Sequence, residues 1–313
     1  MKTCLTGQVN FYWCVWMGHA SFAVMAPANA IVATKTEDGA LPAHLRRRHA
    51  LAELIREDGS IDWSPWYLTE EEDMGQSGQQ GEIIEVMMSS LKVLASERDW
   101  HSVLIAADNF FAWVEDAPLV QVSPDIYLLD DPPPESEELP RRWELWRHPT
   151  HKQPRFVLEI VSADWQKDYR LNPPKYDHMG VGELVIADPD AFCKDLSDRG
   201  RAAFTVYRRT PSDRLELVYR GQGPAYCAAI DAYLCFVWQS KGRARVRISR
   251  DRMGQDIVAT GWELVRAAKK EAQDARKDAQ DARKDACTAE QLAADRAAEI
   301  EALRLRLQKY ERS

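Results

Sequence analysis

The chain has 313 residues, of which 45% are hydrophobic, so it can bury a substantial core and is not disordered throughout. Its formal net charge is −8, and the excess acid lies ahead of residue 262, because residues 262–313 are nearly balanced. An acidic protein of this kind is not a general nucleic-acid coat, since affinity for phosphates comes largely from Lys and Arg, so any DNA contact needs a local basic patch.

The first thirty residues contain one Lys, an interrupted apolar stretch and an Ala-Asn-Ala ending, which together resemble a secretory signal only weakly. Gly18, His19 and Pro27 interrupt this stretch, so we favour a disordered leader, or an over-extended start with Met25 as the true beginning, over export. The six cysteines form no CxxC pair and have no zinc-type spacing, which indicates reduced thiols and a cytoplasmic location. No run of about 18 apolar residues occurs, so no membrane-spanning helix is predicted.

Two amphipathic helices are predicted ahead of the strands. A short helix over Leu45–Ile55 precedes a polar, Gly-containing linker, and the folded core is expected to begin after that linker. A second helix is predicted over residues 82–96, where one helical stripe carries the apolar residues Ile83, Val86, Met87, Leu91 and Leu94. This second helix is expected to pack on a sheet.

Apolar runs of strand length follow in the segments "HSVLIAADNFFAWV", "LVQVSPDIYLLD", "RFVLEIVS", "ELVIADP", "AAFTVYRR" and "LELVYR". A helix is predicted between the third and fourth runs, with Asn172 as its cap, Pro173 at its first position and Gly180 as its left-handed terminator. A strand, a helix and a strand, with uniformly apolar strands, indicate a sheet covered on both faces. The class is therefore α/β or α+β with a mixed sheet.

The C-terminal tail contains the seven-residue repeat "AQDARKDAQDARKDA". Its register places Ala272, Ala279, Ala286, Ala293, Ile300 and Leu307 at one core position of a coiled coil, and Ala275, Ala282, Ala289, Leu303 and Tyr310 at the other. Alanine buries little area, so most of the stabilisation would come from Ile300, Leu303 and Leu307. The alternative is an isolated charged helix.

Glu159 interrupts an otherwise apolar strand, and it is the main chemical signal in the sequence. Strand alternation places it on one face with Val157 and Val161, where an unpaired buried charge would cost several kcal/mol. Asp125 follows Pro124, a residue that marks a strand edge or corner from which a carboxylate can point into a cleft. Two carboxylates from neighbouring strands suit Mg²⁺ or Mn²⁺.

The segments "PD" at residues 124–125, "VLEIVS" at 157–162 and "DYRLNPPKYDHMGVGELVIADPD" at 168–190 resemble the Uma-type restriction endonuclease family of the PD-(D/E)xK nuclease superfamily. The resemblance covers about residues 82–264, and the ordered series of motifs is more specific than "PD" alone. It implies a restriction endonuclease-like α/β fold, with a mixed central sheet flanked by helices.

By that resemblance, Asp125 and Glu159 would hold the metal that activates water for attack on a phosphodiester. The sequence departs from the family at the assisting lysine: the usual position after the glutamate is Val161, and the family's alternative position on the following helix is Asn172. Lys175 is the nearest replacement, with Lys167 and Lys152 as further candidates.

Glu82 or Glu85 is a candidate third acid, the alternative being that either simply faces solvent. Two clusters of basic residues are candidates for DNA phosphate contacts or for solvated faces. The cluster before Glu159 contains Arg141, Arg142, Arg147, Lys152 and Arg155, of which Arg147, Lys152 and Arg155 are the candidate DNA contacts, and the cluster after the core contains Arg243, Arg245 and Arg247.

The predicted organisation is an N-terminal extension over residues 1–78, a nuclease-like domain over 79–261 and a coiled-coil helix over 262–313 that mediates homo-oligomerisation. The predicted function is a Mg²⁺-dependent DNA endonuclease. The alternatives are an inactive nuclease fold that binds DNA or assembles through its coiled coil, and an unrelated α/β domain in which Glu159 pairs with an arginine.

Overall fold

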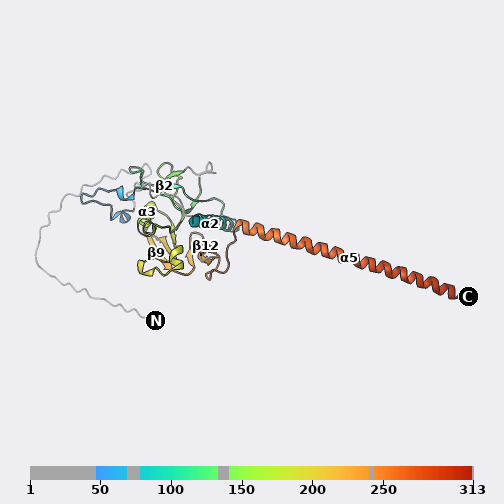
Figure 1. Ribbon diagram of the computed structural model, residues 1–313. Helices are drawn as coiled ribbons and strands as arrows, with labels where there is room; N and C mark the ends of the chain where they lie inside the picture. Colours follow the sequence, from blue (N-terminus) through green and yellow to red (C-terminus); the bar gives the residue numbers. More distant parts are fainter. Residues whose placement is uncertain (1–46, 69–77, 133–140, 240–242, 312–313) are drawn as a thin grey trace, which may run out of the picture. The chain divides into compact units, whose positions relative to one another are not determined.

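The computed structural model describes residues 47–68, 78–132, 141–239 and 243–311 (Figure 1). The chain divides into two compact units, Met1–Pro42 and Ala43–Ser313, and all described residues belong to the second. Met25 and the leader, together with residues 45 and 46 of the first predicted helix, therefore lie outside the described residues.

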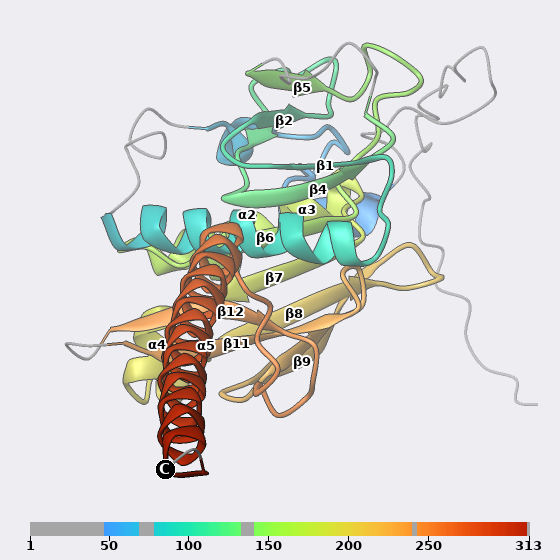
Figure 2. The same cartoon turned by 90° about the vertical axis from the view of Figure 1, so that its right-hand side faces the viewer.

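Six strands form a central mixed sheet in the order β1-β4-β6-β7-β8-β9, which runs from top to bottom in Figure 2. The strands are β1 (Val103–Ala106), β4 (Ile126–Asp130), β6 (Phe156–Ile160), β7 (Glu183–Ala187), β8 (Phe204–Arg209) and β9 (Leu215–Gly221). Within this sheet, β6 and β7 pair in parallel and the other neighbouring strands pair antiparallel, and the helix α3 (Asn172–Met179) lies between β6 and β7 in sequence. The α/β class with a mixed sheet is confirmed.

One face of the sheet is covered by the helix α2 (Gly78–Glu97) and a second sheet. The whole apolar stripe predicted for α2 is buried, and most of it packs with Phe156, Leu158 and Ile160 of β6. The second sheet consists of β10 (Ala225–Cys227), β11 (Ala232–Trp238) and β12 (Ala244–Ser249), with β12 against α2. Figure 2 shows α2 lying in front of β6.

The opposite face is covered by α3, by a third sheet and by the segment 47–68. The third sheet consists of β2 (Phe110–Ala112), β3 (Gln121–Val122) and β5 (Arg142–Glu144). Leu51, Leu54 and Trp66 are buried in the core on this face. The folded body therefore includes part of the expected N-terminal extension, because these apolar side chains find their burial there.

The first predicted helix is reduced to the 3₁₀ helix η1 (Arg48–Leu51), followed by turns. A second 3₁₀ helix, η2 (Ser64–Trp66), follows, and Asp62 accepts the Ser64 backbone N–H at 3.0 Å just before it. Tertiary contacts hold this segment in place of a longer helix. The His49 ring, for example, bonds to Asp177 of α3 at 2.8 Å. The segment is fixed by its side chains and not by a long hydrogen-bond ladder.

The helix α3 ends as predicted but begins differently. Gly180 has φ +101° and terminates the helix with its backbone N–H bonded to Tyr176 and Asp177. The helix continues directly from a π-helix, η3 (Lys167–Leu171), so Asn172 lies inside helical backbone and is not the N-cap. Because its side chain does not cap the helix, Asn172 is able to bond to Glu159. A short helix, α4 (Pro189–Cys193), and a 3₁₀ helix, η4 (Ser197–Arg199), follow β7.

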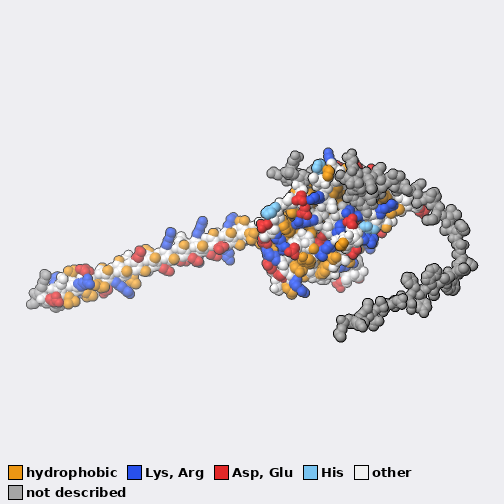
Figure 3. Space-filling view, turned by 180° about the vertical axis from the view of Figure 1, so that it is seen from behind, with side chains coloured by type: hydrophobic (Ala, Val, Ile, Leu, Met, Phe, Trp, Pro, Cys, Tyr) orange, Lys and Arg blue, Asp and Glu red, His pale blue; other side chains and the backbone are white. Residues whose placement is uncertain are grey.

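The tail forms one continuous helix, α5 (Gly261–Glu311). A capping box starts it: Thr260 Oγ1 accepts the Glu263 N–H at 3.2 Å, and Glu263 Oε2 accepts the Thr260 N–H at 2.7 Å. Ile300, Leu303 and Leu307 are all exposed, and apolar and charged side chains are interspersed along the helix in Figure 3. No helix in the described part of the chain is long and apolar enough to cross a membrane.

Candidate functional site

Asp125 and Glu159 meet at one end of strands β4 and β6. The antiparallel register pairs Ile126 with Leu158, so Asp125, directly before β4, lies opposite Glu159. The Asp125 backbone N–H donates to Glu159 Oε2 at 3.3 Å. Alternation along β6 places Glu159 on the same sheet face as Val157, as the sequence predicts, and the core on that face also contains Tyr127 of β4. The structure thus brings together the two acids that the sequence singled out.

The carboxylate of Asp125 is held by donors from two elements. The backbone N–H of Ile160 donates to Oδ2 at 2.7 Å, and Gln80 Nε2, from the first turn of α2, donates to Oδ1 at 2.8 Å. Burial raises the pKa of Asp125 well above its usual value, and the neighbouring charge of Glu159 raises it further. The position is fixed by neutral donors that leave the negative charge uncompensated.

Glu159 is held in the same way. Its Oε1 accepts a hydrogen bond from Asn172 Nδ2 at 3.1 Å and another from the Tyr176 hydroxyl, both on α3. Burial, followed by the charge of Asp168, raises the pKa of Glu159 from 4.5 to about 7. Asn172 therefore has a role in this site that a helix cap would not have.

Asp168 is a third buried acid that the sequence analysis did not select. It lies on the π-helix η3, and its pKa is raised from 3.8 to about 7 by burial and then by the charge of Asp125. The exposed fractions of Asp125, Glu159 and Asp168 are 8%, 4% and 7%. The sequence does contain one signal for it: Asp168, Asn172 and Tyr176 are spaced four residues apart, which places polar groups on one side of a helix. Asp168 itself lies on a π-helical turn, and such turns are frequent at functional sites.

These carboxylates are suitable donors for a divalent cation. They supply hard oxygen atoms, and burial and their mutual repulsion raise their pKa values, so a bound cation would stabilise their ionised forms. Within the described residues, no group of three or more His, Cys, Asp or Glu side chains is arranged to hold an ion.

Two lysines are candidates to assist this site. Lys167 is among the leading influences that lower the pKa values of both Glu159 and Asp168. Lys175, the sequence-based candidate, is 1% exposed and lies on α3 next to Tyr176. Lys167 is hard to select from the sequence, because its position along the chain does not indicate the π-helix on which it lies.

The two candidate accessory acids on α2 occupy other environments. Glu82 is ion-paired with Arg245 at 3.1 Å and with Arg243 at 3.7 Å, and Glu85 is exposed. The contribution of α2 to the acids comes from Gln80, one half-turn earlier. Two residues along a helix correspond to about half a turn, so Gln80 faces Asp125 whereas Glu82 faces Arg245.

Most of the candidate DNA-contacting cations already have acidic partners. Arg247 pairs with Glu263 at 2.8 Å, and Arg147, the most exposed of the six, lies 3.4 Å from Glu144. Arg155 pairs with Asp130 at 2.8 Å and lies over the Trp100 ring, and Lys152 pairs with Asp131 at 2.7 Å. Arg243 and Arg245 share Glu82, and the other four cations pair with four different acids.

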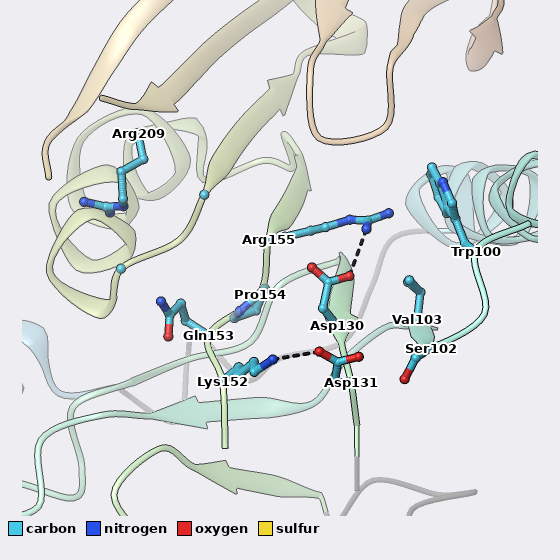
Figure 4. A pocket seen from close by; sticks show the side chains of 12 residues that line it. Trp100, Ser102, Val103, Asp130, Asp131, Lys152, Gln153, Pro154, Arg155 and Arg209 are labelled. Atoms are coloured by element: carbon cyan, nitrogen blue, oxygen red, sulfur yellow. Dashed lines mark hydrogen bonds and ion pairs between the residues drawn. The ribbon is translucent and has the colours of Figure 1, made fainter. Parts of the chain in front are cut away.

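A cavity of about 630 Å³ lies at the other end of β4 and β6 (Figure 4). The ion pairs Arg155–Asp130 and Lys152–Asp131 line it, as Figure 4 shows. The acids that line this cavity are paired with cations, so we place the candidate site at Asp125 and Glu159, which have no cationic hydrogen-bond partner among the described residues.

The comparison with protein families agrees with this geometry. Residues 71–224 match the model of the Uma2 family, described as "Putative restriction endonuclease", and this range includes Asp125, Glu159 and Asp168. No curated protein matches the chain. The region from residue 71 to residue 224 is a domain of the Uma2 family.

Proposed function

We propose that this protein is a Mg²⁺- or Mn²⁺-dependent endonuclease that hydrolyses DNA phosphodiester bonds. The observation that carries the proposal is that Asp125 and Glu159 lie together at one end of the neighbouring strands β4 and β6. Burial raises the pKa values of both side chains. The Uma2 match supports nuclease chemistry. The hard-oxygen donors support the choice of metal.

Asp125 and Glu159 would hold the metal, which when bound activates water and offsets charge on the phosphate. The Ile160 N–H and Gln80 orient the carboxylate of Asp125. Asn172 and Tyr176 orient the carboxylate of Glu159 from α3. Two oriented carboxylates lose little further freedom when an ion binds, which favours a defined geometry for catalysis.

Lys167 is the lysine that we assign to assist the reaction, with Lys175 as the alternative. A cation next to Glu159 and Asp168 would stabilise negative charge that develops on the attacked phosphate. Lys167 is also partly exposed, as a residue that meets a substrate must be.

The nuclease proposal is tested by incubating supercoiled plasmid with purified protein and Mg²⁺ or Mn²⁺. The wild type should nick the plasmid, Glu159→Ala should abolish nicking, and EDTA should do the same. The matched control is Glu144→Ala, which removes a partly buried strand glutamate from β5 that already has arginine partners. Wild-type protein that nicks no faster than Glu159→Ala would overturn the proposal.

We also propose that α5 pairs with α5 of a second copy in the cytoplasm, so that two nuclease domains act on one DNA. The exposed Ile300, Leu303 and Leu307 at core positions of the repeat support pairing. Sedimentation should give an oligomer for the wild type and a monomer for Leu303→Asp. A monomeric wild type at micromolar concentration would contradict this part.

One observation favours a second function, that of an inactive nuclease fold which binds DNA or assembles through α5. Asn172, at the position where the family has a lysine, gives Glu159 a neutral donor in place of a charge. An inactive domain would bind plasmid yet leave it intact with either metal. Nicking that depends on Glu159 excludes this alternative.

A further inference from the structure

Four aromatic rings form a continuous stack from the core to the surface. Phe204 of β8 stacks on Phe236 of β11 with centroids 4.8 Å apart, and Phe236 stacks on Phe192 of α4 at 4.7 Å. Phe192 in turn packs against Trp238, the last residue of β11, at 5.0 Å. Phe204 is fully buried, whereas Trp238 is 56% exposed. The stack therefore ends in an indole that is more than half exposed and that rests against Phe192.

Two chain paths place this stack at the same strand ends as the candidate site, on the sheet face that α2 covers, which is opposite the face of Val157 and Glu159. The helix α4, which carries Phe192, begins directly after β7, whose Ile186 pairs with Glu159. Arg245 and Arg243, at the start of β12, pair with Glu82 of α2, two residues from the Gln80 that bonds to Asp125. The hairpin end of β11 and β12, α4 and the first turns of α2 all lie at the left in Figure 2.

Two cations lie near members of this stack along the chain. Arg243 precedes the residue that pairs with Trp238 across the hairpin, and Lys194 lies two residues after Phe192. Both are exposed, and each belongs to an exposed ion pair, at 3.7 Å from Arg243 to Glu82 and 3.4 Å from Lys194 to Asp190. Such surface pairs contribute little, so a phosphate can displace the carboxylate.

An exposed indole at the end of an aromatic stack, with cations near members of that stack, has the chemistry of a base-stacking platform. An intact duplex covers the faces of its bases, so only an unpaired or flipped base presents a face to Trp238. Resting on the proposed nuclease function, we infer that Trp238 stacks on an unpaired nucleobase beside the phosphodiester that is cut. The preferred substrate is then single-stranded DNA, or duplex DNA with a gap or flap.

The test measures binding without catalysis. A fluorescein-labelled 12-nucleotide oligothymidine and a labelled 12-base-pair duplex are titrated with full-length protein in EDTA, and affinity is followed by anisotropy. Trp238→Ala should weaken binding of the single strand on the order of 10-fold and leave duplex binding unchanged, while Trp238→Phe should retain most of the affinity. Trp262→Ala, an exposed tryptophan on α5, is the matched control and should behave as wild type.

Equal affinity of wild type and Trp238→Ala for the single strand would overturn the inference, as would an equal loss on the duplex. A change in sedimentation without a change in oligonucleotide affinity would also overturn it and would make this face a contact between copies. Because binding is measured without metal, a protein that binds as expected but cuts no DNA refutes the nuclease proposal alone. A protein that nicks plasmid but binds oligothymidine independently of Trp238 refutes the platform alone.

Discussion

Strands β4 and β6 carry acidic side chains near both of their ends, in two contrasting environments. At the cavity end, Asp130 accepts a hydrogen bond from Arg155 at 2.8 Å, and Asp131 accepts one from Lys152 at 2.7 Å. The hydrogen bond and charge of Lys152 lower the pKa of Asp131, and its carboxylate is largely exposed. Cationic partners and solvent therefore stabilise the charge of these two acids, as in an ordinary structural ion pair.

At the other end, the same two strands present Asp125 and Glu159 to neutral donors only. Gln80, Asn172 and Tyr176 bond to their carboxylates, and burial raises their pKa values. The contrast shows that an acid near the end of a strand is not in itself a signal of function. The informative property is burial without a cationic hydrogen-bond partner, because the protein then leaves charge for an ion or a proton to neutralise.

The largest expected effect is on cleavage, where Asp125→Asn and Asp130→Asn make a matched pair at the two ends of one strand. Losing a metal ligand removes several kcal/mol of transition-state stabilisation, so Asp125→Asn should lower the nicking rate by roughly 10³-fold or more. Asp130→Asn should retain wild-type nicking. Initial rates on supercoiled plasmid measure both, and comparable losses in the two variants would break the contrast.

A second, smaller effect separates the two lysines. Lys167→Met should slow nicking by about 10²-fold with little change in thermal midpoint, since general acid–base or electrostatic assistance contributes on that order. Lys175→Met, which alters a buried residue of α3, should change the thermal midpoint more. If Lys175→Met alone abolishes nicking in a folded protein, then the assignment of the assisting lysine reverts to Lys175.

Stability should depend on pH in a direction set by the unpaired acids. Folding raises the pKa values of Glu159 and Asp168 from 4.5 and 3.8 to about 7, so between about pH 4 and pH 7 the folded state keeps protons that the unfolded chain has released. The free energy of unfolding of metal-free protein should therefore fall as pH rises across this window, by on the order of 3 kcal/mol from Glu159 alone. Denaturant unfolding at pH 5 and pH 8 measures the fall.

Glu159→Gln is the control for this pH dependence, because its amide cannot ionise. It should be less sensitive to pH than the wild type and more stable at pH 8 in EDTA. A wild type whose metal-free stability is level or rises from pH 5 to pH 8, with no difference from Glu159→Gln, is incompatible with buried acids of raised pKa.

The smallest expected effect is at the cavity end. Lys152→Ala removes an ion pair between two largely exposed side chains, and such pairs typically contribute little to stability because water and salt screen them. Unfolding at low and high salt should give nearly the same stability for Lys152→Ala and the wild type. A large loss of stability in Lys152→Ala would contradict the expectation that the exposed ion pair contributes little to folding.

The sequence predicts local features of the site well. Strand alternation places Glu159 on its observed face, the apolar stripe of α2 is buried, and Gly180 ends α3. These features depend on periods of two and about four residues, which can be read within one segment.

Features that depend on long-range contacts could not be read in that way. Asp168 reaches the site because a π-helix changes the register ahead of Asn172, and no composition rule places that insertion. The choice of Gln80 over Glu82, and the pairing of Arg245 with Glu82, depend on how α2 docks against β12. The burial of Leu51 likewise depends on a surface supplied by residues far along the chain.

The most direct test of the account is calorimetric titration of Mn²⁺ into metal-free protein at pH 8. The wild type should bind the ion with a heat that disappears in both Asp125→Asn and Glu159→Gln and persists in Asp130→Asn. Absence of binding in the wild type, or unchanged binding in Glu159→Gln, would contradict the claim that these two buried carboxylates form a cation site.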